Sequence, residues 1–266
     1  MRTRKPAQLL LAFFGDMVMD RHDEPVPAPL MLDVLEGADV APATTRATLN
    51  RMAGRGMLTR VRKGRGIAYG LTDTGVEVLR EAAVRVNRPR PFDAQGKGWT
   101  LVTFSVPEGQ RDLRHRLRAT LTWAGFAPLR DGLWVAPGDV DLGAALHPLQ
   151  RELPPGSLTA FRARELEGFE MGDSVGSAWE LDSIRAHHLD FADEWRETPE
   201  PRGKTPALTT RTALVADWLA LLRADPGLPR GYLGDSWPAD DSTAIFRARR
   251  RELAVPSARE FDARVG

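Results

Sequence analysis

The chain has 266 residues, of which 42% are hydrophobic and 27% are charged, and its formal net charge is only +1 at pH 7. This composition is typical of a globular protein of more than one domain, and no apolar run approaches the roughly 20 residues that a membrane-spanning helix needs. Because the chain contains no cysteine, disulfides, thiolate zinc sites and cysteine nucleophiles are excluded.

Positive charge is concentrated in the first part of the chain. Residues 1–100 contain 16 basic and 11 acidic side chains, whereas residues 101–266 contain 21 basic and 25 acidic ones. A local excess of positive charge attracts polyanions. We therefore expect a polyanionic partner to bind the N-terminal segment.

The N-terminal stretch MRTRKPAQLLLAFFGDMVMD superficially resembles a signal peptide, because basic residues precede an apolar run. However, Gly15 and Asp16 interrupt that run, and no small-residue cleavage site follows. Its apolar positions recur at helical spacing: Leu10, Phe13, Phe14 and Met17. The pattern predicts an amphipathic helix at the start of a cytoplasmic protein.

Two further helices are predicted over residues 27–56. The first, within PAPLMLDVLEGADV, places Leu30, Val34 and Leu35 on one face and ends at Gly37, a residue suited to a left-handed cap. The second, within APATTRATLNRMAGRG, has Pro42 in its first turn, where proline is tolerated, and ends at Gly56. Its core-facing residues are Thr45, Leu49 and Met52.

The opposite face of the second helix is polar and carries Arg46, Asn50 and Arg51, with Thr44 near the helix start. These side chains are of the types that reach phosphates and base edges in the major groove of DNA. The alternative is an ordinary solvated helix face.

A basic hairpin follows this helix. MLTRVR and IAYGLT alternate as strands around the turn KGRG, so that Arg62, Lys63 and Arg65 lie at the tip, and a capped helix begins at Thr72 or Asp73. A helix-turn-helix followed by a basic hairpin is typical of a winged helix, in which the hairpin contacts the DNA backbone. A winged helix that serves only protein contacts is the alternative.

NRPRPFDAQGKG, residues 87–98, is rich in proline, glycine and charge and is predicted to be a linker. The next segments read as a strand (WTLVTFSV), a helix (EGQRDLRHRLRATLTWAG), a strand pair (FAPLRDGLWVAP), a helix (GDVDLGAALHPLQREL) and a strand (SLTAFRAREL). This order predicts a ferredoxin-like domain.

Helices dominate the C-terminal part, within AWELDSIRAHHLDFADEWRE and ALTTRTALVADWLALLRAD, separated by a second linker, TPEPRGKTP. The prediction is thus an α+β multidomain protein: a winged helix-turn-helix domain (1–86), a linker (87–98), a ferredoxin-like dimerisation domain (99–175) and a mainly α-helical regulatory domain (176–266). We expect the C-terminal helices to close over the middle domain.

No metal site or cofactor is expected. The chain has five histidines, none paired at the spacing of a known site. His187 and His188 are neighbours, so they project about 100° apart on a helix and are poorly placed to chelate one ion. We expect these two histidines to be solvated.

Three regions, the first of them in two stretches, resemble the PaaX-type transcriptional repressors, bacterial regulators of phenylacetate catabolism. They are LLLAFFGDMVMDR with TRATLNRMAGRGMLTRVRKGRGIAYGLTDTG, then WTLVTFSVPEGQRDLRHRLRATLTWAGFAPLRDGLWVAP, and finally ALVADWLALLRADPGLPRGYLGDSWP. The resemblance covers nearly the full chain and implies a homodimeric repressor that binds double-stranded operator DNA and is released by phenylacetyl-CoA or a related aryl- or acyl-CoA thioester.

The family's middle domain is similar to the small ferredoxin-like nuclease of CRISPR spacer acquisition, which carries an aspartate at the end of its first strand. Here the corresponding stretch is FSVPE, with Ser105, Pro107 and Glu108 but no aspartate. A single carboxylate beside a proline is poor support for a metal site. We expect no enzymatic activity and a role in dimerisation, with a metal-dependent nuclease as the alternative.

A CoA thioester needs cations for its phosphates and an apolar pocket for its acyl group. Arg111, Arg114 and Arg118 fall at i, i+3 and i+7 and are candidates for phosphate contacts, although a solvated face opposite the leucines is the simpler interpretation. Three tryptophans are candidates to flank the pocket, with a core position as their commoner role: Trp99, Trp123 and Trp134.

Two other interpretations of the whole chain remain open. The scaffold is also compatible with a regulator of another pathway with a different ligand, because ligand specificity depends on pocket residues that the pattern does not locate. A purely structural interaction protein with a soluble hairpin is the third possibility, and it predicts no salt-dependent affinity for DNA.

Overall fold

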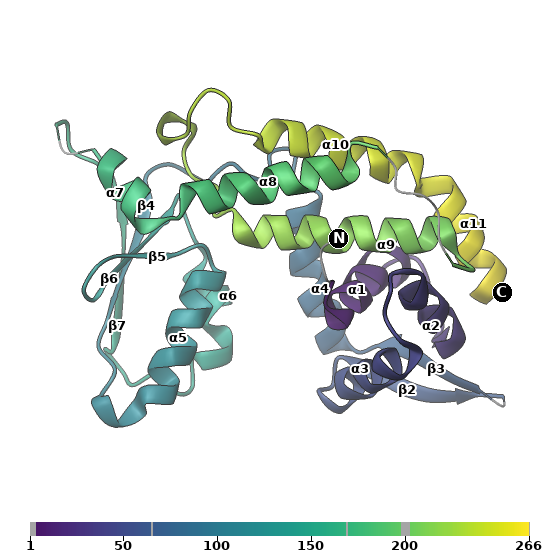
Figure 1. Cartoon of the computed structure of the whole chain (residues 1–266). Coiled ribbons are helices and arrows are strands. Elements are labelled where there is room, and N and C mark those ends of the chain that lie inside the picture. Colours follow the sequence, from purple (N-terminus) through teal and green to yellow (C-terminus); the bar gives the residue numbers. More distant parts are fainter. Residues whose placement is uncertain (1–3, 65, 169, 198–202, 266) are drawn as a thin grey trace. The chain divides into compact units, whose positions relative to one another are not determined.

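The computed structural model describes residues 4–64, 66–168, 170–197 and 203–265 (Figure 1). The chain divides into two compact units. Unit 1 takes its described residues from Met1–Pro89, Leu189–Leu221 and Asp240–Gly266, and unit 2 takes them from Arg90–His188 and Leu222–Ala239. No helix in the described ranges is long and apolar enough to cross a membrane.

Unit 1 begins with helix α1 (Pro6–Phe13), which continues into a π-helical turn, η1 (Phe14–Val18). The predicted apolar positions Leu10, Phe13, Phe14 and Met17 are all buried, which confirms the helix, but no residue from 9 to 19 is exposed, so this segment is covered on nearly all sides and is not amphipathic. Asp16, which interrupts the apolar run in the sequence, is buried as well.

The N-terminal segment continues with a short strand, two helices, a hairpin and a third helix. These elements are β1 (Val26–Pro27), α2 (Ala28–Gly37), α3 (Pro42–Gly54), β2 (Leu58–Lys63), β3 (Gly66–Leu71) and α4 (Asp73–Val86). The three strands form an antiparallel sheet in the order β1-β3-β2.

The ends of these helices agree with the predicted caps at two positions out of three. Gly56 has φ 73°, so it ends α3 as predicted, and the Thr72 side chain caps α4 by accepting a hydrogen bond from the Gly75 N–H at 3.0 Å. The prediction for Gly37 was wrong, because Gly37 is still helical and the left-handed residue is Asp39, with φ 62°. Aspartate is one of the few residues besides glycine that tolerates this conformation.

Unit 1 also contains the end of α8 (Leu181–Trp195), most of α9 (Pro206–Ala224), and the helices α10 (Ala239–Glu252) and α11 (Ala254–Val265). Every residue of α9 from 208 to 219 is buried, as expected of a helix that is covered on all sides. One of its neighbours is α10, whose Phe246 stacks on Trp218 at a centroid distance of 4.3 Å.

The C-terminal helices of unit 1 pack on the N-terminal segment. The Thr209 hydroxyl of α9 donates to the Val34 carbonyl of α2 at 3.2 Å, and Arg4 pairs with Asp217 of α9 at 2.7 Å. Asp217 also accepts a hydrogen bond from the Trp195 indole at 3.0 Å. The C-terminal part is thus divided, because residues 189–221 and 240–266 group with the N-terminal segment, whereas residues 222–239 group with the middle domain.

Unit 2 is built on a four-stranded antiparallel sheet in the order β5-β6-β4-β7. Its elements are β4 (Trp99–Phe104), η2 (Glu108–Gln110), α5 (Arg111–Trp123), β5 (Ala127–Arg130), β6 (Leu133–Pro137), α6 (Leu142–Leu146), η3 (His147–Leu149) and β7 (Leu158–Ala163). The order of strands and helices is ferredoxin-like, as predicted.

One predicted helix of unit 2 is shorter than expected. GDVDLGAALHPLQREL forms α6 over only five residues, Leu142–Leu146, and then a 3-10 turn over His147–Leu149. Pro148 lacks an N–H and cannot donate a hydrogen bond to the Ala144 carbonyl, which accounts for the early end of α6.

Two apolar cores lie on opposite faces of this sheet. Trp134 and Val102 face α5 and α6, whereas Trp99 and Val135 face α7 (Gly172–Ala178) and the segment around η4 (Arg230–Tyr232). Trp99 and Trp134 therefore do not share a pocket, contrary to that suggestion. The third candidate, Trp123, is 57% exposed and lies under the Arg223 guanidinium at 4.6 Å.

The predicted linker is anchored at its end by close backbone contacts. The Gly138 N–H donates to the Gly98 carbonyl at 2.7 Å. A methyl group at Gly98 would lie 2.3 Å from the Ala163 carbonyl oxygen, so only glycine permits this approach. Residues 96–98 are thereby held against the ends of β6 and β7.

Candidate nucleic-acid interface

Helix α3 separates an apolar face from a polar one. Thr45, Leu49 and Met52 are buried as predicted, and Thr48 is buried between them. The predicted contact residues lie on the exposed face: Thr44, Arg46, Asn50 and Arg51. The helix therefore presents two cations, an amide and a hydroxyl to its surroundings.

One of these groups, Arg51, is oriented by contacts along the helix. The Thr48 hydroxyl donates to the Thr44 carbonyl at 2.8 Å, and the Arg51 guanidinium donates to the Thr48 oxygen at 3.2 Å. Arg51 is thus drawn toward its own helix, whereas no such bond holds the exposed Arg46 in the described part of the chain.

The hairpin β2–β3 is joined to α3 by a side-chain hydrogen bond. The Tyr69 hydroxyl donates to the Asn50 amide oxygen at 2.9 Å. In the strand register Arg60 lies opposite Tyr69 and Arg62 lies opposite Ile67, so both arginines share the hairpin face of Tyr69. Asn50, Arg60 and Arg62 therefore lie on one continuous surface.

Sequence reasoning missed Arg60 and Tyr69 as members of this surface. Arg60 lies two residues before Arg62 in the strand, so the alternation of TRVR contained the signal that the two share a face. Tyr69 carried no local signal, because its role depends on the packing of β3 against α3.

The hairpin tip is less positive than its sequence indicates. Lys63 pairs with Glu24 at 2.7 Å, and both side chains are largely exposed. The hydrogen bond and charge of Lys63 lower the pKa of Glu24, which keeps that carboxylate ionised and offsets the lysine charge. Arg62 donates to the Gly64 carbonyl at 3.4 Å, and Arg65 lies outside the described residues.

The base of the hairpin is fixed to both neighbouring helices. The Thr72 hydroxyl donates to the Gly56 carbonyl at 2.6 Å, and the Thr72 N–H donates to the Met57 carbonyl at 3.3 Å. The end of α3, the start of β2 and the start of α4 therefore meet at one point. This junction sets the angle at which the hairpin leaves α3.

The three arginines proposed for an effector lie on α5 in unit 2 and differ in their surroundings. Arg111 and Arg118 are exposed, but Arg114 is half-buried and donates to the Val106 carbonyl at 2.6 Å. Arg111 and Arg118 are therefore exposed cations in the described structure, whereas Arg114 helps to hold the loop between β4 and α5.

The expectation that both neighbouring histidines are solvated was wrong for His188. His188 is fully buried in unit 2, and its Nε2 lies 2.9 Å from the Asp225 carboxylate, with Phe92 edge-on at 4.6 Å. His187, the next residue toward the N-terminus, is half-buried. Their different surroundings follow from the rotation of about 100° between neighbouring side chains on a helix.

The stretch considered for a metal-dependent nuclease follows β4. The strand ends at Phe104, and the Ser105 N–H donates to the Ser157 carbonyl at 2.7 Å. Glu108 is the first residue of η2. The described residues contain no group of three or more His, Asp or Glu side chains placed to hold a metal ion.

Comparisons with known proteins agree in three segments of the chain. Residues 5–75 match the PaaX-like protein family, residues 93–174 match the PaaX protein central Cas2-like domain, and residues 179–263 match the PaaX-like protein C-terminal domain. The central match is consistent with the ferredoxin-like topology of unit 2.

Two individual proteins extend this result. The transcriptional repressor PaaX of Escherichia coli strain K12 is 25% identical over 249 residues, which cover 86% of this chain and 74% of that protein. The uncharacterized protein Rv0674 from Mycobacterium tuberculosis shares the fold, with a TM-score of 0.58, 23% identity and 96% coverage of both chains. Because the three family segments follow one another in order over nearly the whole sequence, this chain belongs to the PaaX family.

Proposed function

We propose that the protein is a DNA-binding transcriptional repressor whose N-terminal elements form a winged helix-turn-helix. One observation carries the proposal: the exposed polar face of α3 is joined through the Asn50–Tyr69 hydrogen bond to the hairpin face that bears Arg60 and Arg62. The repressor name of the Escherichia coli relative and the match of residues 5–75 support it.

In this proposal α3 lies in the major groove, where Thr44, Arg46, Asn50 and Arg51 contact base edges and neighbouring phosphates. The hairpin follows the backbone beside the groove with Arg60, Arg62, Lys63 and Arg65. Since Glu24 offsets the charge of Lys63, the two arginines of β2 contribute more to phosphate binding than the lysine does.

The remaining parts of the proposal concern the effector and assembly. The protein controls aromatic-acid catabolic genes of the phenylacetate type and is released from DNA by an aryl- or acyl-CoA thioester, with Arg111 and Arg118 as candidates for phosphate contacts. It acts as a homodimer assembled through the ferredoxin-like domain and has no enzymatic activity. In this proposal residues 1–86 bind DNA, residues 99–175 form the dimer and residues 176–266 are regulatory.

Salt-dependent binding to DNA from the gene's own upstream region, measured by fluorescence anisotropy, tests the proposal. Replacing Arg60 and Arg62 by alanine leaves their phosphates without a cation, so affinity falls for every sequence. The slope of log affinity against log salt then decreases by about 1 for each phosphate that is no longer neutralised.

Replacing Arg46 by alanine weakens the binding free energy by about 1–3 kcal/mol on the operator and by much less on random DNA, because Arg46 binds a base edge.

Arg151→Ala is the matched control, because it removes one exposed arginine from unit 2 and leaves the interface unchanged. If the hairpin and α3 variants weaken operator and random DNA by the same factors, the assignment of the two elements is wrong. Absence of salt-dependent binding in the unaltered protein would favour the structural interaction protein.

Titration of the protein–operator complex with phenylacetyl-CoA at fixed salt tests the effector. Release of the DNA supports the phenylacetate assignment, whereas release only by another acyl-CoA favours a regulator of a different pathway. Cleavage of DNA with magnesium would instead support the nuclease alternative.

A further inference from the structure

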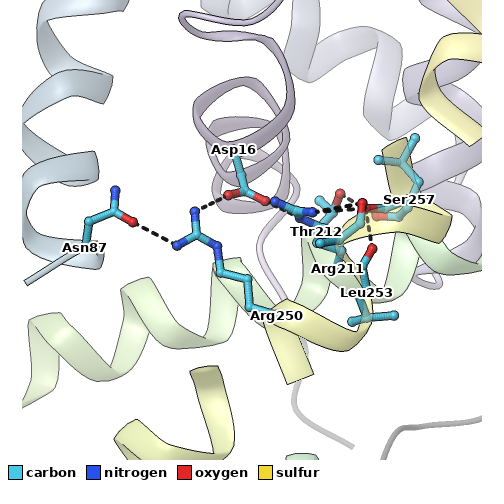
Figure 2. A network of polar contacts seen from close by, with 9 residues as sticks. Asp16, Asn87, Arg211, Thr212, Arg250, Leu253 and Ser257 are labelled. Atoms are coloured by element: carbon cyan, nitrogen blue, oxygen red, sulfur yellow. Dashed lines mark hydrogen bonds and ion pairs between the residues drawn. The ribbon is translucent and has the colours of Figure 1, made fainter. Parts of the chain in front are cut away.

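Asp16 joins the N-terminal segment to the C-terminal helices of unit 1 through two arginines. It lies in the π-helical turn η1 and is only 6% exposed. Its Oδ2 accepts a hydrogen bond from Arg211 Nε of α9 at 2.5 Å, and its Oδ1 accepts one from Arg250 Nη2 of α10 at 2.6 Å (Figure 2).

Each arginine also holds a second element. Arg211 Nη1 donates to the Ser257 hydroxyl of α11 at 3.2 Å. Arg250 Nη1 donates to the amide oxygen of Asn87, the C-cap residue of α4, at 2.8 Å. Figure 2 shows the Arg250 guanidinium between Asp16 and Asn87, so a single planar group sets the spacing of η1, α4 and α10.

The geometry of this network is tightly determined. A buried carboxylate is costly unless charge and hydrogen bonds compensate it, and here both oxygens are engaged by guanidinium groups in fixed directions. Lysine has no equivalent planar fork, and a neutral side chain at position 250 removes the positive charge that compensates one Asp16 oxygen.

Helix α4 connects this network to the candidate DNA interface. Its C-terminal end is held at Asn87, and its N-terminal end begins at the Thr72 junction with β2 and α3. A methyl group at Gly75 would lie 2.2 Å from the Met57 carbonyl oxygen, so the first turn of α4 rests directly on the backbone that leads into β2. A 14-residue helix, about 21 Å long, therefore links Arg250 to the base of the hairpin.

We infer that Arg250 and Asn87 are positioning residues for DNA binding: through α4, the C-terminal helices set the placement of the β2–β3 hairpin beside α3. This inference rests on the proposed DNA-binding function. According to this inference, the C-terminal helix α10 affects operator affinity through its contact with α4 and does not itself touch DNA.

The test compares Arg250→Gln, Asn87→Ala and the double variant in operator binding, with Arg251→Gln as the control. Arg251 is the next residue of α10 and is exposed, so the control removes the same charge from the same helix. Arg250→Gln is expected to weaken operator binding about tenfold, Asn87→Ala less, and Arg251→Gln by less than twofold. The double variant should bind like Arg250→Gln alone, because both changes break one connection.

The salt dependence separates positioning from direct binding to DNA. Removal of a cation that neutralises a phosphate lowers the slope of log affinity against log salt by about 1, whereas a change in hairpin placement shifts affinity with little change in slope. A slope lowered by 1 in Arg250→Gln would identify Arg250 as a phosphate-binding residue and overturn the inference.

Hydrogen exchange of the β2 and β3 amides provides a readout that needs no DNA. Exchange there should rise in Arg250→Gln and Asn87→Ala, and Arg251→Gln should match the unaltered protein. Unchanged exchange and unchanged operator affinity in a folded Arg250→Gln protein contradict the inference. Failure of the unaltered protein to bind DNA contradicts the proposed function, and the exchange experiment then still decides whether Arg250 controls the hairpin.

Discussion

Asp16 shows how a single buried carboxylate remains charged inside unit 1. Burial by itself raises its pKa, but the hydrogen bond from Arg211 and the positive charges of Arg250 and Arg211 outweigh that effect, so the net shift is downward. A carboxyl whose pKa is lower in the folded state than in the unfolded state stabilises the fold above the unfolded value, and this stabilisation is lost as pH falls through the folded value.

The unfolding free energy should therefore decrease in acid, below the ordinary carboxyl pKa of about 4. In Arg250→Gln the pKa of Asp16 rises toward the unfolded value, so the unfolding free energy at neutral pH is smaller, and the loss in acid is also smaller and is complete at a higher pH. Urea unfolding followed across a pH series measures both effects. Arg251→Gln serves again as the control, and a pH profile of Arg250→Gln parallel to that of the control would contradict this account of Asp16.

At the scale of elements, the hairpin depends on the close approach of α4 to the start of β2. Gly75 lies in the first turn of α4, and an added methyl group would meet two backbone atoms of Met57, the nearest at 2.2 Å. Backbone atoms cannot move aside as the end of a flexible side chain can. The junction of α3, β2 and α4 therefore requires glycine at this position.

Gly75→Ala is expected to lower the unfolding free energy by about 3 kcal/mol or more, as a severe overpacking change does. Gly64→Ala is the comparison, because Gly64 has φ 63° but open space around it, and a left-handed alanine costs only about 1–2 kcal/mol. Urea unfolding of the two variants tests the difference. Equal losses would show that the approach of α4 to Met57 is relaxed in solution.

At the scale of the whole molecule, residues far apart in sequence form unit 1. Trp218 of α9 and Phe246 of α10 stack with an interplanar angle of 4°, and both are almost fully buried. Their core is part of the unit that contains the N-terminal helices. A substitution that weakens this C-terminal core should therefore also destabilise α1.

Phe246→Ala is expected to destabilise unit 1 by about 3–5 kcal/mol, because it leaves a cavity beside Trp218. Native-state hydrogen exchange should show reduced protection of the α1 and α9 amides, with a smaller change in β4 and β6 of unit 2. Leu117→Ala, in the core of unit 2, is the reciprocal control and should affect mainly β4 and β6. Equal loss of protection in both units for either variant would contradict their independence.

The elements whose signals are local could be predicted from the sequence. The polar and apolar faces of α3, the cap at Thr72, the left-handed Gly56 and the strand and helix order of the ferredoxin-like unit all follow from side-chain period and turn residues within short windows. The exposed positions of Thr44, Arg46, Asn50 and Arg51 were predictable for the same reason. Pro148 was the local signal that α6 is short, and the prediction of a longer helix did not take it into account.

Contacts between residues far apart in the sequence could not be predicted and are seen only in the folded chain. Asp16 pairs with Arg211, which is 195 residues away in the sequence. Hydrogen bonds also join His188 to Asp225 and Tyr69 to Asn50. The grouping of residues 189–221 and 240–266 with the N-terminal segment was decided in the same way. The physical reason is that local periodicity determines which side of an element is apolar or polar, whereas the identity of the partner on that side depends on how the whole chain buries its surface.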